Sequence, residues 1–207
     1  MTNKKYAILI LWGCCCPLQS VFAEEINSRV IHNYSQVSAG YGYLHDIANT
    51  GVNAHGGIAG ASYEVENFIF GVNGGYFVGD GAFDSDLWSI NAGVGYVIRL
   101  ASNRVNIIPA FGVGYGEVTE TYPDGSSNHG DSTTINPGIT ASYALNNRWS
   151  ISSGYNYGRD VDSGFDTHGL SVGTRVALAE RIGFNLGAVF IEKAGFAGLT
   201  AALSYHF

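Results

Sequence analysis

The sequence predicts an all-β fold: a transmembrane up-and-down antiparallel β-barrel of ten strands, with eight strands as the alternative. Three observations lead there. Apolar and polar or small residues alternate with a period of two along most of the chain. Glycine supplies 29 of the 207 residues, about twice the usual ~7%. After residue 23, no segment reaches the roughly 18 continuous apolar residues of a transmembrane helix.

The first 23 residues have the pattern of a secretory signal peptide. Lys4 and Lys5 precede a short apolar run, and the polar stretch that follows ends in "VFA" before Glu24. We expect cleavage after Ala23. Residues 24–33 are then a short periplasmic segment, and residues 34–207 form the barrel. The apolar run is too short to cross a bilayer as a helix.

The only cysteines are Cys14, Cys15 and Cys16, all within the predicted signal peptide. The mature chain therefore has no disulfide, no thiol nucleophile and no cysteine-ligated zinc. An alternative is a lipoprotein in which "LWGC" carries a lipid on Cys14, but Trp12 is unfavourable there. Without Lys4 and Lys5, eight basic and seventeen acidic residues remain. A net charge of −9 argues against a nucleic-acid partner.

The alternating pattern divides the mature chain into ten segments. Each is near or above the roughly 9 to 11 residues that a tilted strand needs to cross a bilayer. The segments are 34–45, 54–66, 68–78, 87–99, 104–118, 134–145, 149–159, 167–179, 183–192 and 196–207.

One face of these segments is large and apolar, and the other is small. In residues 88–99, Trp88 and Ile90 alternate with Asn91 and Gly93, and the chain ends in the same way with "LTAALSYHF". The small face has too little volume to make the core of a soluble β-sandwich, which is the alternative fold. We therefore expect the large residues to face lipid and the small ones to line the lumen. Pro109 and Pro137 lie inside segments, and we expect β-bulges there.

The connections alternate between short turns and longer acidic loops, which is typical of barrels whose long loops lie outside the cell. Aromatic residues gather beside both kinds of connection and predict two interfacial girdles. Those beside the short turns are Tyr63, Phe68, Tyr96, Tyr143, Trp149, Phe184, Tyr205 and Phe207. Those beside the long loops are Tyr41, Tyr43, Tyr76, Trp88, Tyr115, Tyr155, Tyr157 and Phe190.

The signal peptide, the glycine-rich alternating strands and the terminal "SYHF" resemble the small bacterial outer-membrane β-barrel superfamily, which includes the membrane domain of outer-membrane protein A and the opacity-type proteins. The resemblance implies the cell outer membrane as the location. Tyr205 and Phe207 are similar to the signal that the barrel-assembly machinery recognises in this superfamily, which implies that machinery as a partner. The resemblance implies no activity.

Two loop motifs suggest an enzyme. "DSD" at Asp84 to Asp86 and "DTH" at Asp166 to His168 resemble the paired motifs with which the ten-stranded omptin proteases activate a water molecule. Both motifs share the register of lipid-facing residues, however, so they should point away from the barrel mouth. We therefore predict no catalytic residue, no cofactor and no enzyme activity, with an omptin-like protease as an alternative.

Asp160, Asp162 and Asp166 offer oxygen ligands for calcium, but they lack the terminal bidentate glutamate of an EF-hand loop, and we predict no protein metal site. The loop side as a whole is acidic, which suits divalent cations that bridge to lipopolysaccharide phosphates or, alternatively, simple repulsion of anions. Its acids are Asp46, Asp80, Asp84, Asp86, Glu117, Glu120, Asp124, Asp131, Asp160, Asp162, Asp166 and Glu192, with Arg159 and Lys193 as the opposing bases. The expected partners are therefore outer-membrane lipid and lipopolysaccharide, around a monomer.

By alternation, Glu64, Arg99 and Arg175 face the lumen near the short-turn end. A charge on the lipid face near the bilayer midplane would cost about 2 to 4 kcal/mol. We expect these three side chains to form a charge cluster inside the barrel.

The favoured function is a structural or surface-interaction role without an active site. A narrow small-solute channel is the alternative, because inward glycines leave room for water in a ten-stranded barrel.

Overall fold

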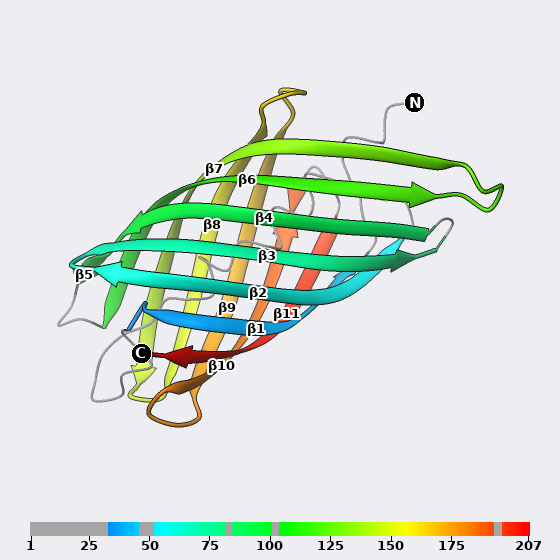
Figure 1. The fold of residues 1–207 in the computed structure, drawn as a ribbon. Helices are drawn as coiled ribbons and strands as arrows, with labels where there is room; N and C mark the ends of the chain where they lie inside the picture. Colours follow the sequence, from blue (N-terminus) through cyan, green and yellow to red (C-terminus); the bar gives the residue numbers. More distant parts are fainter. Residues whose placement is uncertain (1–32, 46–51, 82–83, 101–103, 193–195) are drawn as a thin grey trace.

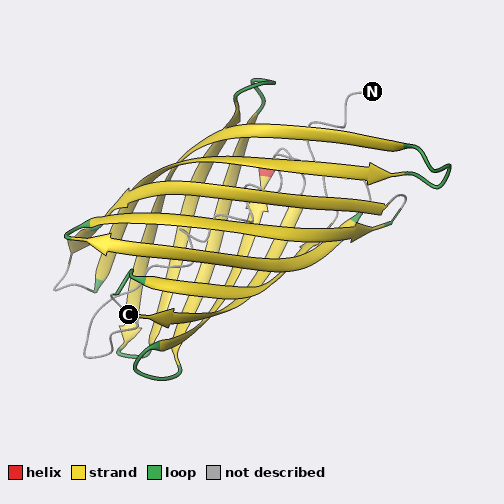
Figure 2. Ribbon diagram, viewed as in Figure 1, coloured by secondary structure: helices red, strands yellow, loops and turns green. Residues whose placement is uncertain are grey.

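The computed structural model describes residues 33–45, 52–81, 84–100, 104–192 and 196–207, which form one barrel (Figure 1). The predicted signal peptide and nearly all of the predicted periplasmic segment lie outside the described residues. Strands account for most of the described chain, and the loops and turns lie at the two ends of the barrel (Figure 2). No helix among the described residues is long and apolar enough to cross a membrane.

The strands follow one another around the barrel in chain order. They are β1 (Gln36–His45), β2 (Asn53–Val65), β3 (Phe68–Asp80), β4 (Asp84–Tyr96), β5 (Ile98–Leu100), β6 (Val105–Thr121), β7 (Ser127–Asn146), β8 (Trp149–Asp160), β9 (Asp166–Ala177), β10 (Ile182–Ile191) and β11 (Phe196–His206). Each pairs antiparallel with its neighbours, and β1 pairs with β11 to close the sheet. Both β4 and β5 pair with β6. In the described residues they are therefore two parts of one strand, which confirms a ten-stranded barrel.

The expected bulges at the prolines are wrong. The β4–β6 ladder stops after Gly95 pairs with Ala110, and the β5–β6 ladder resumes in the same register where Ile98 pairs with Ile107. The gap lies opposite Pro109, because proline has no N–H to donate across the ladder. Pro137 likewise interrupts the β7–β8 ladder without a shift of register. Each proline therefore costs ladder pairs locally and leaves the alternation of faces intact.

The two faces of the wall separate as the alternation predicts. Large apolar side chains point outward and are exposed: Phe70 on β3 keeps 52% of its surface. On the same strand, the inward side chain of Asn73 is only 4% exposed. All the aromatic residues of the two predicted girdles stand at outward positions. An outer wall of this kind is favourable only against hydrocarbon, since in water it would be a very large exposed apolar patch.

The hairpin of β6 and β7 is the longest feature of the barrel. These strands have 17 and 20 residues, and they run well into the region expected to be a loop at residues 119–133. A tight turn joins them: the Tyr122 N–H donates to Ser126 O at 2.9 Å, and Gly125 has a φ of 81°, which glycine adopts without strain. The hairpin extends beyond its neighbours at the long-loop end (Figure 1).

Candidate functional site

A tyrosine that precedes the first strand fills the lumen at the short-turn end. Tyr34 was expected to begin β1, but the strand begins at Gln36, and Tyr34 is fully buried. It belongs to a buried cluster, here called the tyrosine plug, with Ile69, Val97 and Ile108. The last three are inward residues of the wall, so Tyr34 closes the space between them.

Three hydrogen bonds from two strands hold the plug in place. The Asn106 amide donates to the Tyr34 hydroxyl at 2.7 Å, which satisfies the polar end of a buried ring. The Ser62 hydroxyl donates to the backbone oxygen of Tyr34 at 2.6 Å. The Glu64 N–H donates to the hydroxyl of Ser35 at 3.2 Å. The chain before β1 is therefore fastened to β2 and β6 inside the barrel.

The same segment also binds the end of the last strand. The side chain of Asn33 donates to the backbone oxygen of Phe207, and the Phe207 N–H donates to Ser35 O at 3.2 Å. His206 Nδ1 lies 2.9 Å from Asn33 O. The two predicted assembly-signal residues, Tyr205 and Phe207, point outward and are 45% and 53% exposed. The barrel seam is thus closed by residues from both ends of the described chain.

The three charged residues predicted to face the lumen all lie near the tyrosine plug. Arg99 forms an ion pair with Glu64 and also donates to the side-chain oxygen of Asn67. Arg175 is 2% exposed, and its Nε donates to Asn185 Oδ1 at 2.7 Å. Glu64 and Arg99 are on β2 and β5, whereas Arg175 is on β9. Arg175 is thus bonded to the neighbouring strand β10.

Apolar side chains fill the lumen at the long-loop end. Phe77, Leu44 and Leu87 point inward from β3, β1 and β4, and none is more than 1% exposed. The ring of Phe77 lies over two inward glycines in its row, Gly56 and Gly42, and a Cβ on Gly42 would come within 2.8 Å of that ring. We call these three side chains the phenylalanine plug. Between the two plugs, most of the inward residues are small.

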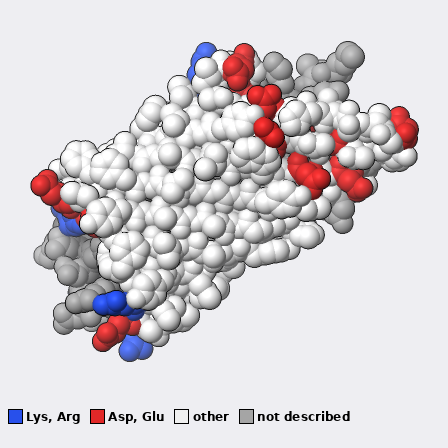
Figure 3. Space-filling model, in the orientation of Figure 1, with Lys and Arg blue, Asp and Glu red and all other residues white. Residues whose placement is uncertain are grey.

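Carboxylates and aromatic donors form a belt on the outer surface at the long-loop end. The Tyr76 hydroxyl donates to Asp86 at 2.6 Å. Glu117 accepts from the Trp88 Nε1–H at 3.0 Å and from the Tyr115 hydroxyl at 2.7 Å. Figure 3 shows acidic side chains gathered at the end of the barrel that bears the long hairpin. The sequence predicted these acids on the loop side of the barrel, and several of them stand on the outer faces of β4, β6 and β7.

The residues of the omptin-like hypothesis are not brought together. Asp84 and Asp86 point outward from β4, and Asp166 and His168 point outward from β9, with three strands between them. His168 is engaged with the Tyr155 hydroxyl at 2.6 Å from its Nδ1. The lipid-facing register argued from the sequence is therefore what the structure shows at these positions.

Of the three aspartates considered for calcium, Asp160 and Asp166 point to opposite faces of the wall. Asp160 is buried, and it accepts from the Ser132 hydroxyl at 2.6 Å and from the N–H groups of Asp162 and Ser163 at 2.8 and 2.6 Å. Its role is therefore to order the turn after β8. Asp166 accepts from the Tyr157 hydroxyl on the outer face. Among the described residues, no group of three or more potential metal-ligating side chains could hold an ion.

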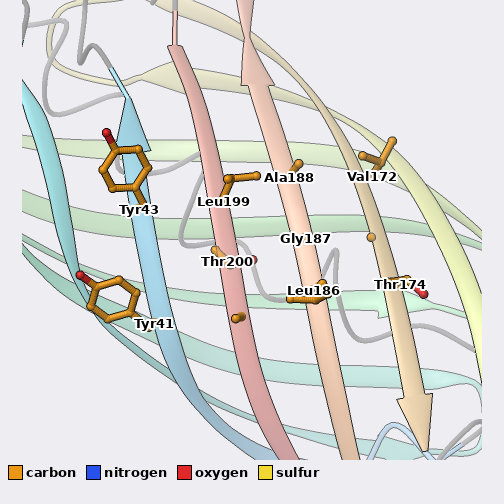
Figure 4. Close-up of a pocket in the computed structure, with 11 residues that line it drawn as sticks. Tyr41, Tyr43, Val172, Thr174, Leu186, Gly187, Ala188, Leu199 and Thr200 are labelled. Atoms are coloured by element: carbon orange, nitrogen blue, oxygen red, sulfur yellow. The ribbon is translucent and has the colours of Figure 1, made fainter.

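A shallow groove of about 550 Å³ crosses the outer wall over β1, β11, β10 and β9. Figure 4 shows Tyr41 and Tyr43 on one side of it, Val172 and Thr174 on the other, and Leu199 and Leu186 between them. The outward residues Ala188 and Ala201 leave room there because their side chains are small. It faces outward, so hydrocarbon covers it in a membrane. The groove could not be predicted from the sequence, because only the pairing of these strands brings its residues together.

Solved structures resemble this chain at low sequence identity. The translocator domain of the autotransporter NalP from Neisseria meningitidis is 10% identical, with a TM-score of 0.53, over 84% of this chain and 88% of that one. Neisserial surface protein A is 14% identical, with a TM-score of 0.46, over 84% and 97%. Ail, the attachment invasion locus protein of Yersinia pestis, is 16% identical, with a TM-score of 0.44, over 84% and 97%.

A comparison with curated proteins found no match. A protein-family model described as "Outer membrane protein beta-barrel domain" matches residues 27–177, which is well over half of the chain. The closed antiparallel wall, the apolar outer face and this match agree with one another. The chain therefore belongs to the outer-membrane β-barrel family, and it is a protein of the bacterial outer membrane.

Proposed function

We propose that this barrel acts through its outer surface, where an acidic belt formed by Asp86, Glu117 and Asp131 binds lipopolysaccharide phosphates through divalent cations. One observation carries the proposal. Glu117 on β6 and Asp131 on β7 are directly paired outward positions, so two like charges stand side by side. In outer-membrane barrels the long-loop end lies outside the cell. The pair is therefore at the level of the outer-leaflet headgroups.

Paired carboxylates on neighbouring strands repel each other and destabilise the sheet, and a bound cation removes this repulsion. Asp86 adds a third carboxylate nearby, because its neighbour Trp88 pairs with Glu117. These side chains are not a complete metal site among the described residues. Magnesium and calcium prefer oxygen ligands and readily share them between a protein and phosphate groups. Phosphates on the lipid would complete the coordination, which ties the barrel to its membrane.

Purified protein in detergent would be tested for binding to lipopolysaccharide with magnesium or with a chelator. We expect magnesium-dependent binding by the wild type. The double variant Glu117→Gln and Asp131→Asn should bind about tenfold more weakly, equivalent to roughly 1.4 kcal/mol. The matched control is Glu66→Gln with Glu180→Gln, which removes two exposed acids from the short-turn end. Equal binding by wild type and belt variant would refute the proposal.

A narrow small-solute channel is the second candidate. Buried polar side chains line part of the lumen, which favours some water inside, whereas the two plugs oppose free passage. In planar bilayers we expect the wild type to be silent. If it conducts, Arg99→Ala and Arg175→Ala should shift its selectivity toward cations, because each removes a positive charge from the lumen. Steady wild-type conductance would favour the channel over a purely surface role.

Proteolysis is the third possibility, and the separation of Asp86 from His168 speaks against it. We expect dibasic peptides to remain intact with protein refolded in lipopolysaccharide. Cleavage that Asp86→Ala or His168→Ala abolished would overturn this expectation.

A further inference from the structure

Three polar side chains point into the lumen between the two plugs. They are Asn73 on β3 and Ser89 and Asn91 on β4, with exposed fractions of 4%, 3% and 4%. Asn73 and Asn91 are directly paired across the two strands. Among the described residues, nothing hydrogen-bonds to Asn73 Oδ1, Ser89 Oγ or Asn91 Nδ2. Buried groups in this condition normally have a partner, because leaving one unsatisfied costs about 1 to 3 kcal/mol.

The adjacent inward positions have no polar side chain to supply those partners. Apart from Leu87, they are glycines: Gly60, Gly71, Gly75, Gly93, Gly114 and Gly116. An interior wall of glycine leaves unfilled the volume that side chains would occupy in a close-packed barrel. Other inward side chains of this section, Ile58, Asn136 and Asn156, are only half-buried although the wall is closed around them. The central section is therefore less filled than either end.

The chemistry of this section selects neutral guests. Asn73 offers an acceptor, Asn91 offers a donor, and the Ser89 hydroxyl can do either. The described inward side chains that carry formal charges stand toward the two ends: Glu64, Arg99 and Arg175 at one, Glu120 and Asp160 at the other. An ion would find no opposite charge beside it, whereas a hydroxyl group can donate and accept at once.

We infer that Asn73, Ser89 and Asn91 form a binding site inside the lumen for neutral hydroxyl-bearing molecules, and that Tyr34 closes its periplasmic entrance. Water is the smallest such molecule and a small polyol is the next. Tyr34 is the residue suited to move and open this entrance, because it precedes β1 and does not belong to a strand of the sheet. The phenylalanine plug, by contrast, consists of strand residues of the wall.

Access to the site can be measured with one engineered thiol, because the chain has no cysteine after Cys16. In protein purified from outer membranes, Ser89→Cys would be reacted with neutral methyl methanethiosulfonate. We expect the cysteine to react slowly when Tyr34 is present. With Tyr34→Ala it should react at least about tenfold faster, which corresponds to a loss of roughly 1.4 kcal/mol in the free energy that keeps the entrance closed. Tyr34→Phe keeps the ring and should react as slowly as the parent.

Two controls accompany the measurement. The parent protein without Ser89→Cys reports any background from cysteines of an uncleaved signal. Unboiled and boiled samples of each variant on detergent gels show whether the barrel has folded. Equal labelling of folded Ser89→Cys barrels with tyrosine and with alanine at position 34 would overturn the role of Tyr34.

Occupancy distinguishes water from polyols. Nuclear Overhauser effects from water to the side-chain amides of Asn73 and Asn91 are expected in the wild type. Glycerol titrated into the Tyr34→Ala variant should produce saturable shifts of the same amides if polyols also enter. Water contacts without glycerol shifts would assign the site to water. Dry amides that glycerol leaves unchanged would refute the site.

Discussion

Tyr34 shows how a single residue outside the sheet changes what the barrel can do. Without its ring, the inward side chains of Ile69, Val97 and Ile108 would border open space at the periplasmic end. A large buried ring with a satisfied hydroxyl is more favourable there than water against apolar walls. The closure of the lumen at this end therefore depends on one side chain and the hydrogen bonds that hold it.

Asp124, at the tip of the long hairpin, gives a prediction for pH dependence. The side chain of Asp124 accepts from the Ser126 hydroxyl at 2.6 Å and from the Ser126 N–H at 2.9 Å. These two hydrogen bonds hold the pKa of Asp124 below the ordinary value of an aspartate, and the bond from the Ser126 hydroxyl has the larger effect. Its contribution to turn stability is present above the ordinary pKa and is lost as pH falls through the lowered one.

This shift can be measured by following the Asp124 carboxyl carbon by NMR against pH. We expect a midpoint below that of an unperturbed aspartate. Ser126→Ala removes the hydroxyl donor but keeps the N–H, so the midpoint should move part of the way back. An ordinary midpoint in the wild type would contradict the bonding seen in the turn.

At the scale of elements, one row across β1, β2 and β3 shows how glycines and a large ring share space. Gly42, Gly56 and Phe77 are paired in turn across these strands, and all three face inward. A Cβ on Gly42 would meet the Phe77 ring at 2.8 Å, whereas a Cβ on Gly56 would meet the backbone oxygen of Tyr76 at 1.9 Å. The ring can move or be shortened, but the backbone cannot.

We therefore expect Gly42→Ala and Gly56→Ala to behave differently in a double-mutant test. Gly42→Ala should destabilise the barrel by about 1 to 3 kcal/mol through overpacking, and adding Phe77→Leu should recover much of that loss. Gly56→Ala should cost more, with no recovery by Phe77→Leu. Urea unfolding in lipid vesicles, followed by tryptophan fluorescence, measures the wild type, the three single variants, including Phe77→Leu alone, and the two double variants. Equal recovery in the two backgrounds would show that the ring is not the obstacle at Gly42.

For the whole molecule, closure of the wall predicts resistance to unfolding. In the described part of the chain, β1 pairs with β11 and β4 pairs with β6, so the sheet closes on itself without an edge from which it can open. We expect unboiled protein to migrate differently from boiled protein on detergent gels. Asn33→Ala with His206→Ala weakens the fastening at the seam and should lower the temperature at which the folded band disappears. An unchanged temperature would mean that the seam is held by the strand ladder alone.

The start of the mature chain is a prediction that intact-mass measurement can check. Protein from the outer-membrane fraction should have the mass of residues 24–207. A diacyl group on Cys14 would instead support the lipoprotein alternative.

The sequence by itself determined the class of fold, the approximate position of each strand and which residues face lipid. Those properties depend on a period of two, which local sequence carries directly. It also predicted that Asp86 and His168 point outward. It did not reveal that Pro109 and Pro137 would interrupt ladders without a bulge, since that choice depends on the partner strands.

Only the tertiary structure decided what fills the lumen. The tyrosine plug joins residues from before β1, from β3, from the link between β4 and β5, and from β6, and no sequence period relates them. The acidic belt likewise exists because strand pairing sets Glu117 beside Asp131. The same pairing surrounds Asn73, Ser89 and Asn91 with glycines. Contacts across strands depend on register and closure, which are properties of the whole sheet rather than of any one segment.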